Sequence, residues 1–165
     1  QTEDVLIAGK LHANDGSRIK RALEVIRSTG RSLFDWRAEK VGGIGDAIDL
    51  KPVLLLPPRP WLHERCDRRF VQMMEQGAIE EVEALLQIDL PPDAPILRAI
   101  GVPEISAMLS DEISRSEAIL RGQAATRQYA KRQFTWFRNQ SAEAWFRFEE
   151  EINYQNMEKI VTLFQ

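Results

Sequence analysis

The chain has 165 residues, of which 44% are hydrophobic and 28% are charged, and its formal net charge is −3. This is an ordinary globular composition, and the length suffices for one domain, or for one domain and part of another. The single cysteine, Cys66, excludes an internal disulfide and indicates a cytoplasmic protein. No run of 18 apolar residues is present that would cross a membrane.

The charges are segregated along the chain. Residues 10–31 contain six basic and two acidic side chains, and residues 121–138 contain five basic and no acidic ones. Residues 75–93 contain six acidic and no basic side chains. Separate patches within a chain that is nearly neutral overall favour a basic face directed at a polyanion.

The first third of the chain predicts short helices followed by a linker. Helices are predicted over residues 4–11, 14–30 and 33–39. The second of these has Asn14 or Asp15 to cap its start and Gly30 to end it. The glycine-rich residues 41–52 predict a loop, and this shift in composition makes them the best internal domain boundary.

The rest of the chain predicts further helices and two short strands. Helices are predicted over residues 61–76, 78–88, 104–109, 114–140 and 155–164, and strands over residues 53–56 and 144–149. Ser114 and Glu117 have the spacing of a capping box. Residues 53–56 are apolar and bounded by prolines, which fits a strand buried on both faces. Because two strands alone do not make a stable sheet, its other partners are expected upstream of this chain.

Two of these helices are expected to bury one stripe of apolar side chains each. In the helix over residues 61–76, the inward stripe is expected to be Leu62, Cys66, Phe70 and Met73. In the helix over residues 114–140, it is expected to be Ile119, Thr126, Ala130, Phe134 and Phe137.

The outward side of the helix over residues 114–140 is rich in basic and aromatic side chains. These are Arg127, Tyr129, Lys131, Arg132, Trp136 and Arg138. Basic side chains neutralise phosphates, and flat rings stack on unpaired bases, so this face predicts binding to a nucleic acid. On residue chemistry alone, a solvated amphipathic helix explains the pattern equally well.

Two further basic clusters are weaker candidates. Arg65 and Arg69 lie one helical turn apart and have the fork geometry to clamp a diphosphate, although pairing with Glu64 or another acidic neighbour is the commoner arrangement. In the helix over residues 14–30, Arg18 and Arg21 lie on one side and also suggest a phosphate contact.

Metal and phosphate-loop motifs are not supported. His63 and Cys66 are three residues apart, but no second ligand pair exists, which argues against a zinc site. The glycines at 42–45 are not followed by Gly-Lys-Ser/Thr and are interpreted as linker.

Four segments resemble one family, the tRNA dimethylallyltransferases, also called tRNA isopentenyltransferases. They occur in the family's order and spacing and are 14-NDGSRIKRALEV-25, 61-WLHERCDRRFVQMMEQGAIEEVEALL-86, 98-RAIGVPE-104 and 126-TRQYAKRQFTWFR-138. The resemblance covers nearly all of residues 14–138, and its last segment is highly specific.

The resemblance implies a transferase that moves a dimethylallyl group from dimethylallyl diphosphate, with Mg²⁺, to N6 of the adenosine 3′ of the anticodon. It implies a mainly α fold with a few short strands: the C-terminal part of a P-loop-type α/β core, residues 53–165, and part of a helical tRNA-binding insertion, residues 1–40. Residues 41–52 would link the two. The tRNA anticodon stem-loop is the implied partner, and full-length members are expected to be monomeric.

The resemblance also implies three tRNA-binding segments. They are Ser17, Arg18, Ile19, Lys20 and Arg21; Arg98, Ala99, Ile100, Gly101, Val102 and Pro103; and Lys131, Arg132, Gln133, Phe134, Thr135, Trp136, Phe137 and Arg138. Arg65 and Arg69 match arginines at the diphosphate end.

This sequence also departs from the family pattern. The N-terminal phosphate loop and the catalytic Asp segment are absent, and Val102 and Pro103 stand where members often have Tyr and a basic residue. The chain is therefore expected to be a C-terminal half that is inactive alone and has no catalytic or metal-ligating residue of its own. We expect it to self-associate, or to stay partly disordered around residues 40–60.

Two other functional hypotheses remain open on the sequence. One is a non-catalytic helical RNA-binding module, and the other is an interaction domain whose basic faces bind an acidic protein. Salt-sensitive binding to an anticodon stem-loop separates the RNA hypotheses from the last one.

Overall fold

The computed structural model describes residues 3–39 and 42–162. It divides the chain into two compact units, an N-terminal unit, Gln1–Leu50, and a C-terminal unit, Lys51–Gln165. The division falls within the predicted linker at residues 41–52. Residues 40 and 41, within the stretch expected to be partly disordered, lie outside the described residues, as do residues 163 and 164 of the last predicted helix.

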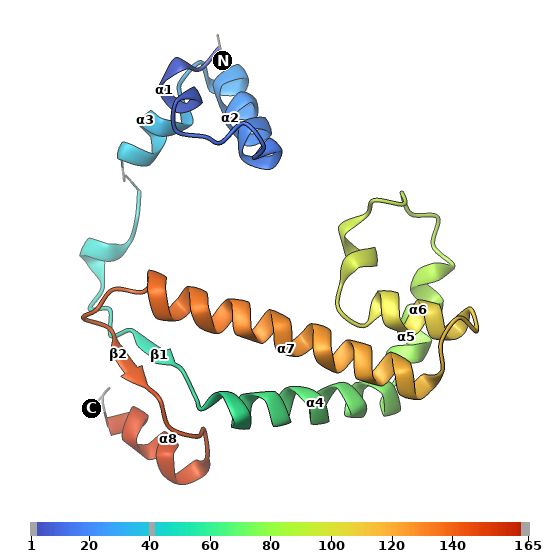
Figure 1. Cartoon of the computed structure of the whole chain (residues 1–165). Coiled ribbons are helices and arrows are strands. Elements are labelled where there is room, and N and C mark those ends of the chain that lie inside the picture. Colours follow the sequence, from blue (N-terminus) through green and yellow to red (C-terminus); the bar gives the residue numbers. More distant parts are fainter. Residues whose placement is uncertain (1–2, 40–41, 163–165) are drawn as a thin grey trace. The chain divides into compact units, whose positions relative to one another are not determined.

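The N-terminal unit consists of short helices. These are α1 (Val5–Ala8), α2 (Gly16–Thr29), α3 (Leu33–Ala38) and the 3₁₀ turn η1 (Gly45–Ala47) (Figure 1). Asp15 caps α2, because its carboxylate accepts a hydrogen bond from the backbone nitrogen of Arg18 at 3.2 Å. Gly30 ends α2 with φ +70°, a left-handed conformation that favours glycine. Both ends of this helix are as predicted.

A buried polar pair ties two helix starts of this unit together. Asp4 accepts hydrogen bonds from the backbone nitrogen of Ile7 at 3.2 Å and from the hydroxyl of Ser32 at 2.9 Å. The same hydroxyl accepts from the backbone nitrogen of Phe34 at 3.1 Å. Since Asp4 and Ser32 are only 6% and 4% exposed, this one interaction caps α1 and α3 at once.

The C-terminal unit is built on two long helices that lie side by side and run antiparallel (Figure 1). They are α4 (Arg59–Glu75) and α7 (Arg115–Gln140). Near the start of α4 lie β1 (Val53–Leu55), β2 (Phe146–Phe148) and α8 (Tyr154–Val161), and near its end lie α5 (Ala78–Leu86), the 3₁₀ turn η2 (Pro95–Arg98) and α6 (Val102–Leu109). The chain is thus mainly helical with short strands, which confirms the predicted fold class.

The core of this unit lies where α4, α5, α6 and α7 meet. Its buried members are Phe70, Met74, Val82 and Ile105. The Phe70 ring can lie against α7 because position 122 is glycine, and a Cβ there would overlap three carbons of the ring. The predicted stripe on α4 was wrong at one position: Met74 is buried, whereas Met73 is 38% exposed.

The two strands form a parallel pair in which Val53 lies opposite Phe146. Leu54 and Phe148 are buried, but Leu55 is 46% exposed and Phe146 is 43% exposed. Within this unit residues 53–56 therefore bury one face only, and the further strand partners that the sequence implies stay a prediction. An isolated parallel pair with one uncovered face departs from the usual arrangement, in which helices cover both faces of a parallel sheet.

The long helix α7 begins as predicted, with the Ser114 hydroxyl accepting a hydrogen bond from the backbone nitrogen of Glu117 at 3.2 Å. Its inward face was predicted wrongly at the last position, because Phe137 is 41% exposed. Arg59, the first residue of α4, already lies over Phe134. The helix therefore continues past the start of α4, so that Phe137 has no partner helix to pack against in the described part of this unit.

Candidate nucleic-acid interface

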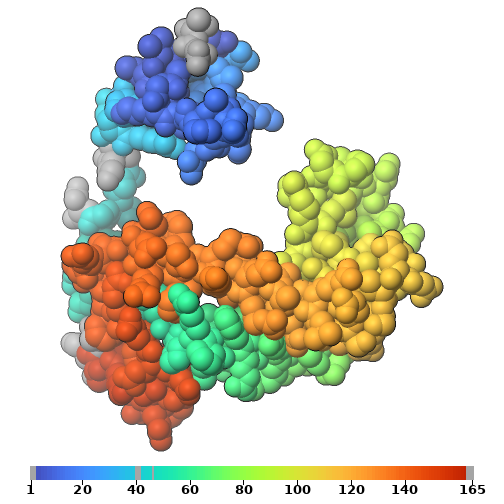
Figure 2. Space-filling model, viewed as in Figure 1, coloured from blue at the N-terminus to red at the C-terminus, as the bar shows by residue number. Residues whose placement is uncertain are grey.

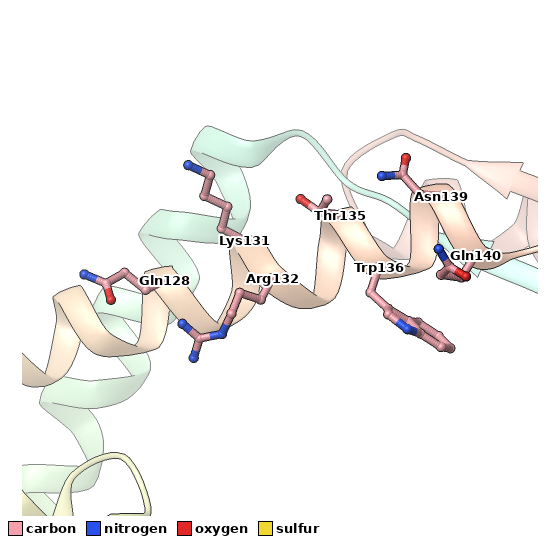
Figure 3. A pocket seen from close by; sticks show the side chains of 7 residues that line it. All are labelled: Gln128, Lys131, Arg132, Thr135, Trp136, Asn139 and Gln140. Atoms are coloured by element: carbon pink, nitrogen blue, oxygen red, sulfur yellow. The ribbon is translucent and has the colours of Figure 1, made fainter. Parts of the chain in front are cut away.

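The second half of α7 carries polar and aromatic side chains, and this stretch is visible on the face shown in Figure 2. A shallow depression of about 570 Å³ runs along it. Its lining residues are Gln128, Lys131, Arg132, Thr135, Trp136, Asn139 and Gln140. Figure 3 shows Lys131, Thr135 and Asn139 pointing to one side of the helix and Arg132 and Trp136 to the other. These two rows follow from the four-residue spacing of an α-helix.

The cations of this surface are available for a ligand. Among the described residues, Lys131, Arg132 and Arg138 take part in no ion pair with a carboxylate. The guanidinium of Arg132 lies 5.6 Å from the centroid of the Tyr129 ring, which is itself 47% exposed. Cations held against rings and left without carboxylate partners suit a polyanion.

Two aromatic side chains lie together at the outer end of the same surface. Trp136 is 60% exposed, and its ring meets that of Phe137 edge to face, with centroids 5.1 Å apart. The sequence had assigned Phe137 to the core, so the second ring of this pair is a finding of the structure. An exposed indole beside unpaired cations is suited to stacking on an unstacked base.

One predicted cation of this surface has a different role. Arg127 was expected on an outward face, but its guanidinium forms an ion pair with the Asp67 carboxylate of α4, and both side chains are only 35% exposed. The amide of Gln123 donates to the backbone carbonyl of Asp67 at 3.1 Å. Arg127 thus fastens α7 to α4 and does not face a ligand.

The structure places the first implied tRNA-binding segment, Ser17 to Arg21, in the first turns of α2 in the N-terminal unit. Its polar side chains are exposed, whereas Ile19 is half-buried. The cations at its ends have acidic neighbours: Arg18 pairs with Asp15 at 3.2 Å and Arg21 with Glu24 at 3.6 Å. Exposed pairs of this kind are weak.

The second implied segment, Arg98 to Pro103, joins η2 to α6. Gly101 has φ +103° and is buried against the ring of Phe70, and its backbone nitrogen donates to the Glu104 carboxylate at 2.9 Å. Arg98 reaches back to the carbonyl of Asp93 at 3.1 Å. The segment thus lies near the first half of α7 (Figure 1). The third segment forms the second half of that helix, so the structure does not bring the two together.

The arginines expected at a diphosphate lie on α4. Arg65 and Arg69 line an open depression with Cys66, Arg68 and Thr126, among others. The guanidinium of Arg65 lies 4.7 Å from the ring centroid of Trp61. The expected alternative, pairing with Glu64, is made instead by Arg68 at 3.5 Å. Burial raises the pKa of the Cys66 thiol, with the Asp67 charge adding to the effect, so this thiol is not a reactive thiolate.

Sequence reasoning missed several residues of this region. Asp67 and Gln123 gave no local signal, because their contacts join positions about sixty residues apart on different helices. Gln128 and Asn139 could have been found, since they continue the four-residue spacing of the basic rows on α7.

The described residues contain no group of three or more His, Cys, Asp or Glu side chains placed to hold a metal ion. In the same residues, no helix is both long and apolar enough to cross a bilayer.

Comparison with known proteins agrees with a nucleic-acid interface on α7. The family described as IPP transferase matches residues 1–140. The chain belongs to this family. It is 55% identical over 150 residues to a tRNA dimethylallyltransferase of Sphingopyxis alaskensis. The aligned residues make up 91% of this chain and 49% of the relative. A relative of the same name from Zymomonas mobilis is 49% identical over 158 residues, or 96% of this chain and 51% of the relative.

Solved structures of the family are similar as well. A tRNA isopentenylpyrophosphate transferase from Bacillus halodurans matches with a TM-score of 0.60 and 30% identity, over 98% of this chain and 48% of the solved one. The corresponding enzyme of Staphylococcus epidermidis matches with a TM-score of 0.60 and 26% identity, over 99% and 53%. The likeness agrees with part of a P-loop-type fold. The chain spans about half the length of the curated relatives that it matches.

Proposed function

We propose that this chain is the RNA-binding part of a tRNA prenyltransferase that moves a dimethylallyl group from its diphosphate to N6 of the adenosine 3′ of the anticodon. The observation that carries the proposal is the surface on α7 of a chain of this family, where Lys131 on one side of the helix, and Arg132 and Trp136 on the other, line one depression. The names of the relatives support the reaction class.

The proposed roles divide between binding and chemistry. Lys131 and Arg132 bind backbone phosphates of the anticodon stem-loop, and Trp136 stacks on a base that has left the helical stack. Arg65 and Arg69 are proposed to face the diphosphate. Loss of the allylic diphosphate is assisted by neutralising its charge, and a base assists the weakly nucleophilic amine.

We further propose that the 165-residue chain binds RNA without transferring the prenyl group. Its sequence contains no G-x-x-x-x-G-K-[ST] motif to hold the diphosphate. The sheet with its uncovered face is proposed to belong to a larger core, and the protein to act in the cytoplasm, where tRNA is modified. Mg²⁺ is proposed only for the larger core.

The test is binding of the 165-residue chain to a fluorescent anticodon stem-loop, measured by anisotropy at several salt concentrations. We expect affinity to fall steeply with salt, and Lys131→Gln with Arg132→Gln to reduce the affinity about tenfold and the slope of log K against log salt by about 1.5. Arg121→Gln is the matched control for each of the two single changes, because Arg121 lies on the same helix and pairs with Glu117 at 2.7 Å. Salt-insensitive binding, or equal losses in variant and control, would refute the proposal.

A further inference from the structure

A third depression of the C-terminal unit lies at the carboxyl ends of both strands. It has a volume of about 260 Å³. Leu56, two prolines and Arg59 reach it from the segment after β1, Glu149 follows β2, and Phe134 and Arg138 come from α7. In parallel sheets, ligands bind in the crevice outside the carboxyl ends of the strands. The position alone therefore makes this depression a candidate site.

The side chains of this depression are arranged for an anion. The guanidinium of Arg59 lies over the Phe134 ring, 5.1 Å from its centroid, so that the cation is held at the wall. Neither Arg59 nor Arg138 is in an ion pair with a carboxylate among residues 3–39 and 42–162. Glu149 supplies the only acidic side chain of the lining, so the depression is net positive.

Two contacts fix the walls. Leu56 is 3% exposed, and its backbone nitrogen donates to the carbonyl of Phe148 at 2.8 Å, which extends the pairing of the strands to the edge of the depression. The guanidinium of Arg147 on β2 donates to the carbonyl of Arg138 at 3.2 Å and so holds the end of α7 beside the strand. Both strands and the helix thus position the two free arginines.

We propose that this depression binds a phosphate group, with Arg59 as its principal ligand. Two guanidinium groups on an apolar wall match the oxygen atoms of a phosphate, and Arg59 belongs to none of the segments implied by the family resemblance. The phosphate can come from an RNA backbone or from a free diphosphate. The inference rests on the proposed function only in naming RNA and diphosphate as the two sources of the phosphate.

The experiment uses two probes, a fluorescent anticodon stem-loop measured by anisotropy and inorganic pyrophosphate measured by calorimetry. Arg59→Gln is expected to weaken binding of the relevant probe about tenfold, as loss of a charged hydrogen bond does. Glu149→Gln is expected to strengthen it about threefold, because the only acidic side chain is removed. Arg121→Gln and Glu117→Gln are the controls: they carry the same charge changes at an exposed ion pair near the start of α7, outside this depression, and should each act less than twofold.

The opposite signs keep the test decisive even if Arg59→Gln disturbs folding, since Glu149→Gln is a change at an exposed position. An effect on the stem-loop alone assigns the phosphate to RNA, and an effect on pyrophosphate assigns it to a free diphosphate. The inference fails if Arg59→Gln matches Arg121→Gln with both probes, or if Glu149→Gln does not strengthen binding. RNA binding that responds to Lys131 and Arg132, with neither probe responding to Arg59, removes this inference and leaves the proposed function. Pyrophosphate binding that depends on Arg59, without RNA binding, does the reverse.

Discussion

Replacing Gly122 by alanine tests how the two long helices are packed. The glycine lies in the middle of α7, where alanine would by itself stabilise the helix by about 1 kcal/mol. Here the added methyl group would overlap the ring of Phe70, which is 3% exposed and belongs to the core cluster. The two effects therefore oppose each other, and the sign of the change reports on the packing.

The magnitude follows from the contact. Overpacking of a core costs about 1–3 kcal/mol, and an overlap with three ring carbons of a side chain enclosed by other helices belongs at the upper end. Subtracting the gain in helix propensity leaves a net loss of about 2 kcal/mol in the free energy of unfolding. For a unit of this size that corresponds to a Tm lower by about 8 °C.

The assay is thermal and urea unfolding of the chain, followed by circular dichroism at 222 nm. Gly16→Ala is the matched control, since Gly16 is also helical and has no atom within 4 Å of an added Cβ. The double variant Phe70→Leu with Gly122→Ala should lose less than the sum of the two single changes, because the smaller side chain leaves room for the methyl group. A Gly122→Ala chain as stable as the parent, or more stable, would refute the packing described here.

Two further predictions concern charges. Asp67→Asn and Arg127→Gln should each lower the free energy of unfolding by about 1–2 kcal/mol, and the double variant should lose clearly less than their sum; additive losses in urea unfolding would contradict the ion pair. A hydrogen bond from an arginine lowers the pKa of Glu3 and likewise that of Glu39. The stability that these two carboxylates contribute is therefore fully present above the carboxyl pKa of the unfolded chain. It is lost as the pH falls through their lower pKa in the folded chain. The amide hydrogen exchange rate of α2 in the full chain, corrected for intrinsic rates, should therefore rise as the pH falls. The rise should be smaller in the variant that combines Glu3→Gln with Glu39→Gln. Equal rises in the two proteins would show that these carboxylates do not cause the pH dependence.

Local signals in the sequence were sufficient to predict the α-helices and several of their ends, although α1 is shorter than predicted and α4 begins two residues earlier. Asp15, Gly30 and Ser114 act through hydrogen bonds or backbone angles within a few residues, so their roles can be read from neighbouring positions. The basic and aromatic rows on α7 also depend only on helical spacing.

What the sequence could not supply depends on partners far along the chain. Met74 rather than Met73 is buried because the place of α5 and α6 against α4 decides which side of that helix is covered. Phe137 is exposed because α7 extends beyond the start of α4. Arg127 forms an ion pair because Asp67 of α4 lies opposite it. The depression beside Arg59 needs two strands and a helix from separate regions, so no local pattern indicates it.

The pairing of β1 with β2 has a consequence for the order of folding. In the sequence, β1 precedes α4 and β2 follows α7, so the hydrogen bonds between the strands close a loop that contains all the helices from α4 to α7. Closing such a loop is entropically costly until the intervening helices have packed. We expect the strands to join last and to separate first. The depression beside Arg59 would then exist only in fully folded molecules. A ligand that binds there would therefore stabilise the entire unit against unfolding.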